Sequence, residues 1–169
     1  DQVAAQRLST VYIPGKKFTM LPETVIHHYT LGEERLCPAL SLYLDVADDF
    51  TVTATESRIE KINVVTNLRH ETLEQDFNET TLRDNNIQYP FCDELKLLWG
   101  FSCKLEELRG KANDINNEKI DYSFEINDDR VTISERRRGS PIDKVVSELM
   151  IYVNTEWGKQ LADANIAGI

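Results

Sequence analysis

The sequence is poor in cysteine and lacks long apolar runs, and both shortages exclude classes of protein. Its three cysteines, Cys37, Cys92 and Cys103, lack the close spacing of metal-ligand motifs. An odd, scattered set is untypical of a disulfide framework or a zinc site, so we expect buried thiols of a cytoplasmic protein. No apolar run approaches the length of a membrane-spanning helix, and the N-terminus has no signal-peptide pattern. The sequence therefore predicts a soluble globular chain with no membrane partner.

Positive charge is also scarce, which bears on nucleic-acid binding. The chain has 19 Lys and Arg residues against 29 Asp and Glu residues, a net charge of −10. Affinity for a phosphate backbone comes from basic side chains, so the total charge argues against this class of ligand. The local field along a groove matters more than the total, however, and the basic residues are unevenly distributed. Charge alone therefore decides nothing.

The common enzyme signatures are missing as well. The sequence has no Gly-rich phosphate loop, no nucleophile elbow and no pair of metal-binding histidines at helical spacing. His27 and His28 are adjacent, so they cannot face one ligand from a single helix or strand. We interpret them as a surface pair.

Alternation of apolar and polar residues predicts strands in the first half of the chain. Residues 10–22 form short extended segments around a turn at Pro14-Gly15. Residues 40–46 and 50–55 alternate with a period of two, which indicates an antiparallel hairpin, and we expect Ile62 and Val64 to extend the sheet. The clearest hairpin comes later and pairs residues 120–126 with residues 131–133.

Helical spacing of apolar residues predicts the other elements. A short helix is expected over about residues 68–82, and a longer one from Phe91 to Gly110. Ser140 is a good N-cap. Pro141 follows it at the first helical position, and Asp143, three residues after Ser140, is placed as in a capping box. The apolar stripe that follows extends this helix to about residue 163. The predicted fold class is α+β, with antiparallel hairpins in one sheet covered by at least two long helices.

Two groups of residues could contact RNA, and each also has a purely structural interpretation. Tyr12 could belong to the core, or could stack on an unpaired base, a contact of about 1–3 kcal/mol. Arg136, Arg137 and Arg138 could be a solvated strand end. Because they precede a helix N-terminus, they could instead bind phosphate together with its free N–H donors.

The last predicted helix carries further candidates. Glu148 lies beside the apolar stripe, four residues after Lys144. A surface ion pair between Lys144 and Glu148 would stabilise the helix by about 0.3 kcal/mol. Asn154 on the flank of this helix could be merely an exposed polar residue.

Several segments together resemble the RNB catalytic domain of the ribonuclease II family, which includes ribonuclease II and ribonuclease R-like exoribonucleases. Ser/Thr, Tyr and Pro at residues 9–14 are followed at the family's spacing by Met-Leu-Pro at residues 20–22. Residues 37–41 resemble the start of the next strand, and residues 144–154 look like the family's helix with Glu, Met and Asn at fixed spacing. The stretch at residues 139–144 is most similar to a group of bacterial members.

This resemblance implies hydrolysis of single-stranded RNA from its 3′ end to nucleoside 5′-monophosphates. It implies Mg²⁺ as the cofactor, held by a cluster of aspartates that activates water and stabilises the charge on the scissile phosphate. By similarity, Tyr12 would stack on bases near the 3′ end, and the helix with Glu148 would border the catalytic channel.

The sequence departs from the family pattern at several places. The aspartate cluster belongs upstream of Asp1, and a catalytic Arg in a Ser-Pro-x-Arg motif belongs downstream of Ile169. Residues 1–169 are therefore expected to be the central part of one RNB-like domain, truncated at both ends and inactive alone. His70 replaces an expected Tyr, and Ser147 precedes Glu148 where many relatives have two Glu residues. His70 and Glu148 are thus weak catalytic candidates.

Two alternatives to the enzyme stay open at this point. The chain could be a non-catalytic module of the same family that binds RNA or a protein, as the acidic charge favours, or an unrelated α+β domain. If it is an enzyme segment, its partners are single-stranded RNA, the missing portions of the domain and OB-type RNA-binding domains. Aspartates closely spaced upstream of Asp1 would distinguish the enzyme from the binding module.

Overall fold

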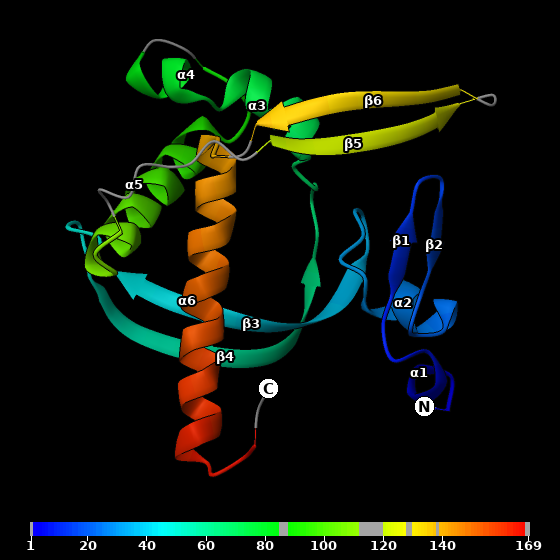
Figure 1. Ribbon diagram of the computed structural model, residues 1–169. Helices are drawn as coiled ribbons and strands as arrows, with labels where there is room; N and C mark the ends of the chain where they lie inside the picture. Colours follow the sequence, from blue (N-terminus) through cyan, green and yellow to red (C-terminus); the bar gives the residue numbers. More distant parts are fainter. Residues whose placement is uncertain (1, 85–87, 112–119, 128–129, 138, 168–169) are drawn as a thin grey trace. The chain divides into compact units, whose positions relative to one another are not determined.

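The computed structural model describes residues 2–84, 88–111, 120–127, 130–137 and 139–167. Helices and antiparallel hairpins occur together, so the α+β class is confirmed (Figure 1). None of the helices in these ranges is long and apolar enough to cross a membrane. The elements in chain order are α1 (Gln2–Arg7), β1 (Val11–Ile13), β2 (Lys16–Phe18), α2 (Glu23–Tyr29), β3 (Leu36–Val46), β4 (Val52–Asn63), α3 (His70–Asp76), α4 (Glu79–Arg83), α5 (Cys92–Leu108), β5 (Ile120–Asn127), β6 (Arg130–Arg137) and α6 (Pro141–Asp163).

The chain forms two compact units, and each is described by itself. The hairpin unit comprises Asp1–Tyr43, Glu56–Asn67 and Ile120–Arg136. The helical unit comprises Leu44–Thr55, Leu68–Lys119 and Arg137–Ile169, so it includes the tip of the β3–β4 hairpin.

Each strand pair forms its own two-stranded sheet, β1–β2, β3–β4 and β5–β6. The hairpins at residues 40–55 and 120–133 are confirmed. β3 begins at Leu36, before the predicted alternation, and β4 continues to Asn63, so the predicted extension is confirmed for Ile62 but not for Val64. The expectation that the hairpins share one sheet does not hold for the strands that the structure describes. Alternation identifies a half-buried strand and its hairpin partner, but contains no information on which other strands lie beside it.

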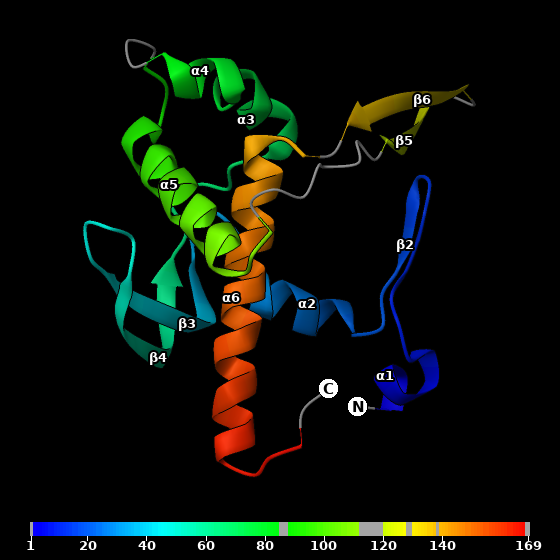
Figure 2. The same ribbon diagram turned by 60° about the vertical axis from the view of Figure 1, so that its left-hand side comes forward.

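The core of the helical unit lies where α3, α5 and α6 pack together. Helices α5 and α6 lie side by side in both views (Figures 1 and 2). Their apolar stripes meet, as the helical spacing predicted. A T-shaped contact joins the rings of Phe77 and Trp99, whose centroids are 6.5 Å apart. The buried members of the cluster are Leu73, Phe77, Leu95, Ile142 and Val145.

Local hydrogen bonds fix where the long helices begin and end. Ser140 caps α6 in a capping box with Asp143, as predicted. Helix α5 ends in a Schellman motif, in which Gly110 has a φ of 71° and Lys111 N–H donates to the carbonyl of Glu106 at 3.1 Å. The predicted role of Gly110 as the C-terminal cap is confirmed.

The single helix predicted over residues 68–82 is wrong, because two helices, α3 and α4, occupy this stretch. Asn78 separates them. Its side chain accepts hydrogen bonds from the N–H groups of Thr80 and Thr81 at 3.0 and 3.2 Å and so caps α4. Asn offers the backbone these local bonds in place of a continuous helix, and the apolar spacing does not report them.

The tip of the β3–β4 hairpin packs against α5 through Phe50 and Gly100. A Cβ atom built on Gly100 would lie 2.5 Å from the Cζ atom of Phe50. Non-bonded carbon atoms do not approach each other this closely, so the packing of the Phe50 ring depends on glycine at position 100.

Candidate functional site

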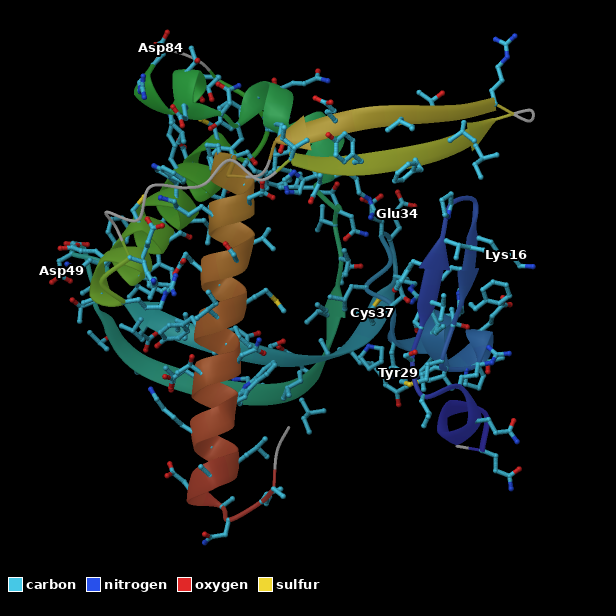
Figure 3. The ribbon with its side chains drawn as sticks, viewed as in Figure 1. Lys16, Tyr29, Glu34, Cys37, Asp49 and Asp84 are labelled. Carbon is cyan, nitrogen blue, oxygen red and sulfur yellow. The ribbon has the colours of Figure 1, made fainter. Side chains whose placement is uncertain are left out.

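Tyr12 lies on β1 and is 75% exposed, so it is not part of a core formed by the residues that the structure describes. It pairs with Lys17 of β2, whose Nζ atom lies 5.9 Å from the centre of the Tyr12 ring. Lys16 likewise lies over the Phe18 ring at 4.8 Å, and its side chain points outward from β2 (Figure 3). The small hairpin therefore presents two aromatic rings, each beside a positive charge, which suits stacking next to a phosphate.

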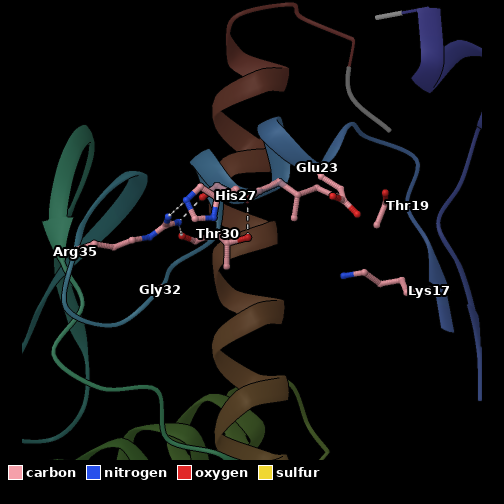
Figure 4. A pocket seen from close by; sticks show the side chains of 8 residues that line it. Lys17, Thr19, Glu23, His27, Thr30, Gly32 and Arg35 are labelled. Carbon is pink, nitrogen blue, oxygen red and sulfur yellow. Dashed lines mark hydrogen bonds between the residues drawn. The ribbon is translucent and has the colours of Figure 1, made fainter. Parts of the chain in front are cut away.

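A pocket of about 500 Å³ lies between β2 and the end of α2 in the hairpin unit (Figure 4). Arg35 reaches the last turn of α2 and donates to the carbonyl oxygens of His27 and Thr30. Its guanidinium thus satisfies carbonyls at a helix C-terminus, which is a structural use of the charge. Gly32 permits this approach, because a Cβ there would lie 2.8 Å from Arg35 Nε.

The adjacent histidines are both exposed, which confirms the predicted surface pair, and they face different partners. His27 Nε2 lies 3.3 Å from Nη1 of Arg35. The His28 ring makes an edge-on contact with Tyr29 at 4.8 Å between centroids.

The arginines before α6 are only partly described. Arg136 and Arg137 end β6, with side chains outside the described part, and Arg138 lies outside the described residues altogether. Some of the N–H donors near this helix N-terminus are already bound. Asp143 Oδ2 accepts from the N–H groups of Gly139 and Ser140 at 3.0 and 3.3 Å. The capping box therefore competes with any phosphate at this N-terminus.

Glu148 is buried, at 4% exposure, and its partner is not Lys144. Arg109, at the end of α5, donates to both carboxylate oxygens. Its Nε donates to Oε2 at 3.1 Å, and its Nη2 donates to Oε1. Lys144 instead pairs with Glu106 at 2.6 Å and lies over the Trp99 ring. The predicted Lys144–Glu148 pair is wrong, because α5 supplies a nearer partner to each.

The neighbours of Glu148 on α6 are solvent-facing or inert. Asn154 is exposed, as its structural interpretation predicted, and the Ser147 hydroxyl donates to the carbonyl of Asp143 at 2.7 Å.

Burial raises the pKa of the half-buried Cys103 thiol on α5, which the Lys144 ammonium only partly offsets, so the thiol is a poor nucleophile. The structure describes all three cysteines, and none of them forms a disulfide; Cys37 and Cys92 are buried, as predicted, whereas Cys103 is only half-buried.

His70 opens α3 and meets two carboxylates, a contact that sequence reasoning missed. Its Nδ1 lies 3.0 Å from Glu74 Oε1, and its Nε2 lies 3.1 Å from Asp143 Oδ1. The Ser140 hydroxyl donates to the same Glu74 oxygen at 2.9 Å. The i, i+4 spacing of His70 and Glu74 was the available signal, whereas the approach of α6 was not visible in the sequence.

The described residues do not fit the magnesium centre that the resemblance implies. Among them, the group of His, Cys, Asp and Glu side chains close enough to share an ion is His70, Glu74 and Asp143. Mg²⁺ prefers an all-oxygen shell, and this group includes an imidazole. No catalytic step through magnesium can therefore be assigned to these residues.

Comparisons with known proteins extend over the whole chain. A family model described as RNB domain matches residues 1–169. Exoribonuclease 2 of Vibrio parahaemolyticus is 26% identical over 178 residues, which cover 100% of this chain and 26% of that protein.

Two solved structures have a similar fold. Mycoplasma genitalium RNase R in complex with ribose methylated single-stranded RNA matches with a TM-score of 0.75 and 15% identity, over 99% of this chain and 26% of that one. The apo form of the same protein matches with a TM-score of 0.75 and 14% identity, over 98% and 26%. The chain thus spans about a quarter of the length of these relatives.

Proposed function

The chain belongs to the RNB domain family, and on that basis we propose that it is the central part of a magnesium-dependent 3′-to-5′ exoribonuclease. The proposed substrate is single-stranded RNA and the products are nucleoside 5′-monophosphates. The observation that carries this proposal is the family match over residues 1–169, supported by the similarity to Exoribonuclease 2 and RNase R.

Within that enzyme, the proposed task of this segment is to contact RNA. Tyr12 supports this assignment, because it is 75% exposed beside Lys17 on a hairpin whose other ring also faces a lysine. Arg136, Arg137 and Arg138 remain proposed phosphate contacts. Other parts of the protein, including OB-type domains, would supply further RNA contacts, and we expect the enzyme to act in the cytoplasm.

The hydrolytic chemistry is proposed to come from residues outside this segment. The magnesium ligands would precede Asp1 and the catalytic Arg would follow Ile169. The contacts of Glu148 and His70 favour a structural role over a catalytic one, because Glu148 is bound by Arg109, and His70 lies between Glu74 and Asp143.

The test is release of nucleotides from a 3′-labelled single strand of RNA in the presence of Mg²⁺. We expect no release by the purified 169-residue chain, and stepwise shortening from the 3′ end by the longer protein that contains it. Magnesium-dependent release by the purified chain would sink the proposal that the metal ligands lie outside it.

A second candidate function is a non-catalytic module of the same family that holds RNA or a protein. The ion pair of the buried Glu148 with Arg109 and the carboxylate partners of His70 favour it, since Glu148 and His70 then serve the packing of helices. The reading frame upstream of Asp1 distinguishes the two functions. Four closely spaced aspartates there support the enzyme, and their absence supports the binding module.

A further inference from the structure

The pocket between β2 and the end of α2 gathers positive charge in a chain whose net charge is −10. Lys17 points into it from β2, and Arg35 lies with His27 at its other end (Figure 4). Among the residues that line the pocket, Glu23 is the acidic one. A lysine and an arginine therefore face a single carboxylate. Because the local field decides which ligand a pocket attracts, this pocket favours an anion.

The charge of Arg35 is fixed in position at the wall of the pocket. Its Nη2 donates to the carbonyl oxygens of His27 and Thr30, and its Nη1 lies 3.3 Å from His27 Nε2. A guanidinium has more N–H donors than these contacts use. Its Nε is buried and has no hydrogen-bond partner among the residues that the structure describes. A buried donor without a partner is unfavourable, and an acceptor atom of a bound ligand would satisfy it.

The pocket is large enough to hold a whole nucleotide. Its volume of about 500 Å³ lies within the range of small-ligand pockets, which is about 300–1,000 Å³. Ile26 supplies an apolar wall, and Thr19 and Thr30 supply hydroxyl groups. A phosphate bound near the positive charges would thus leave room for a ribose and a base.

Lys17 connects the pocket to the proposed RNA contact. Its Nζ lies 5.9 Å from the centre of the Tyr12 ring, and the two residues pair across the β1–β2 hairpin. A nucleotide whose base stacks on Tyr12 would therefore have a positive charge within reach of its phosphate. We propose that the pocket binds the phosphate group of a nucleotide between Lys17 and Arg35. The choice of a nucleotide rests on the proposed function, whereas the choice of an anion rests on the pocket itself.

The phosphate has two possible sources, a free nucleoside monophosphate or a strand of RNA that passes over Tyr12. The competing account is that both cations serve the fold alone. Lys17 would then only contact the Tyr12 ring, and Arg35 would only bind the carbonyls at the end of α2. The accounts differ in whether removal of the Lys17 charge changes the affinity for a nucleotide.

The experiment is a calorimetric titration of the 169-residue chain with adenosine 5′-monophosphate (AMP) at low, fixed salt. We expect one equivalent bound, and about tenfold weaker binding in Lys17→Gln, because a charge-assisted hydrogen bond to the phosphate is lost. Lys16→Gln is the matched control, since Lys16 precedes it on β2 but lies over the Phe18 ring and does not line the pocket. It should bind AMP like the unsubstituted chain, and circular dichroism shows whether each variant is folded.

A second variant tests the pocket through the opposite charge. Glu23→Gln removes the carboxylate that repels a phosphate, so it should tighten binding about threefold. Loss of structure would weaken binding in both variants. Opposite effects of Lys17→Gln and Glu23→Gln therefore require a ligand that responds to the charges of this pocket.

Two further ligands identify the source of the phosphate. Adenosine lacks the phosphate and should bind about tenfold more weakly than AMP. If a short single strand of RNA shows the effects of Lys17→Gln and Glu23→Gln and AMP does not bind, the site belongs to the strand and not to the free nucleotide.

Three results would overturn the proposal. In the first, Lys17→Gln binds both AMP and the strand as tightly as Lys16→Gln does. In the second, adenosine binds as tightly as AMP, and in the third, Glu23→Gln weakens binding. Failure of the proposed function is distinguishable, because it is measured as nucleotide release by the longer protein and does not depend on these affinities.

Discussion

The helical unit and the hairpin unit differ in how many apolar side chains they bury. Within the described residues, Cys37 is the fully buried apolar residue of the hairpin unit, whereas the aromatic rings at Tyr12, Tyr122 and Phe124 are 75%, 54% and 48% exposed. Exposed apolar surface of this extent marks a surface for binding or for further packing. The helical unit contains the other buried apolar residues: Leu73, Phe77, Cys92, Leu95, Phe101, Leu105, Ile142 and Val145. The buried apolar core is therefore concentrated in the helical unit, which also exposes apolar side chains such as Leu97, Leu108 and Met150.

The most direct test of this difference in burial is to remove one aromatic ring from each unit. Phe77 is fully buried in the helical core, so Phe77→Ala should lower the free energy of unfolding by about 3–5 kcal/mol. Phe124→Ala, at 48% exposure, should lower it by less than about 1 kcal/mol. Urea unfolding measures both, and similar losses at the two positions would contradict the division into a packed and an exposed unit.

The ion pair between the buried Glu148 and Arg109 gives the next largest expected effect. Glu148→Gln removes the charge that Arg109 binds and should cost about 1–3 kcal/mol of unfolding free energy. The matched control is Glu156→Gln, since Glu156 pairs with a mostly exposed Lys159 and should contribute less than about 1 kcal/mol. Equal effects in urea unfolding would show that burial of Glu148 does not strengthen the pair.

Two glycines on helices test how tightly the helical unit is packed. Ala favours a helix over Gly by about 1 kcal/mol, but a Cβ at Gly100 would overlap Phe50. Gly100→Ala should therefore lower the unfolding free energy by about 1–2 kcal/mol. A Cβ at Gly158 meets no atom within 4 Å, so Gly158→Ala should raise the unfolding free energy by up to about 1 kcal/mol. A gain at both positions would show that the hairpin tip moves away at little cost.

What the sequence predicted correctly depended on neighbours along the chain. The capping box of Ser140 and Asp143 joins residues three apart, and β5 and β6 are consecutive strands of the chain, so local patterns contained both. The break at Asn78 was also local, but its signal was a side-chain hydrogen bond and not an apolar period.

The features that sequence patterns missed join residues far apart. Arg109 and Glu148 are 39 residues apart, and Ser140 and Glu74 are 66 apart. Helical spacing tells which face of each helix is apolar, but not which polar groups meet when two helices pack. For the same reason, the sequence could not exclude the Lys144–Glu148 pair that α5 displaces.

The central claim, that the hairpin unit contacts RNA through Tyr12, is tested most directly by the affinity of the chain for a short single strand of RNA at fixed salt. Fluorescence anisotropy should show Tyr12→Ala binding about tenfold more weakly, since one stacked base is worth about 1–3 kcal/mol. Tyr29→Ala, a control at a tyrosine 62% exposed in the same unit, should bind like the unsubstituted chain. Equal affinities of the unsubstituted chain and Tyr12→Ala would contradict the account.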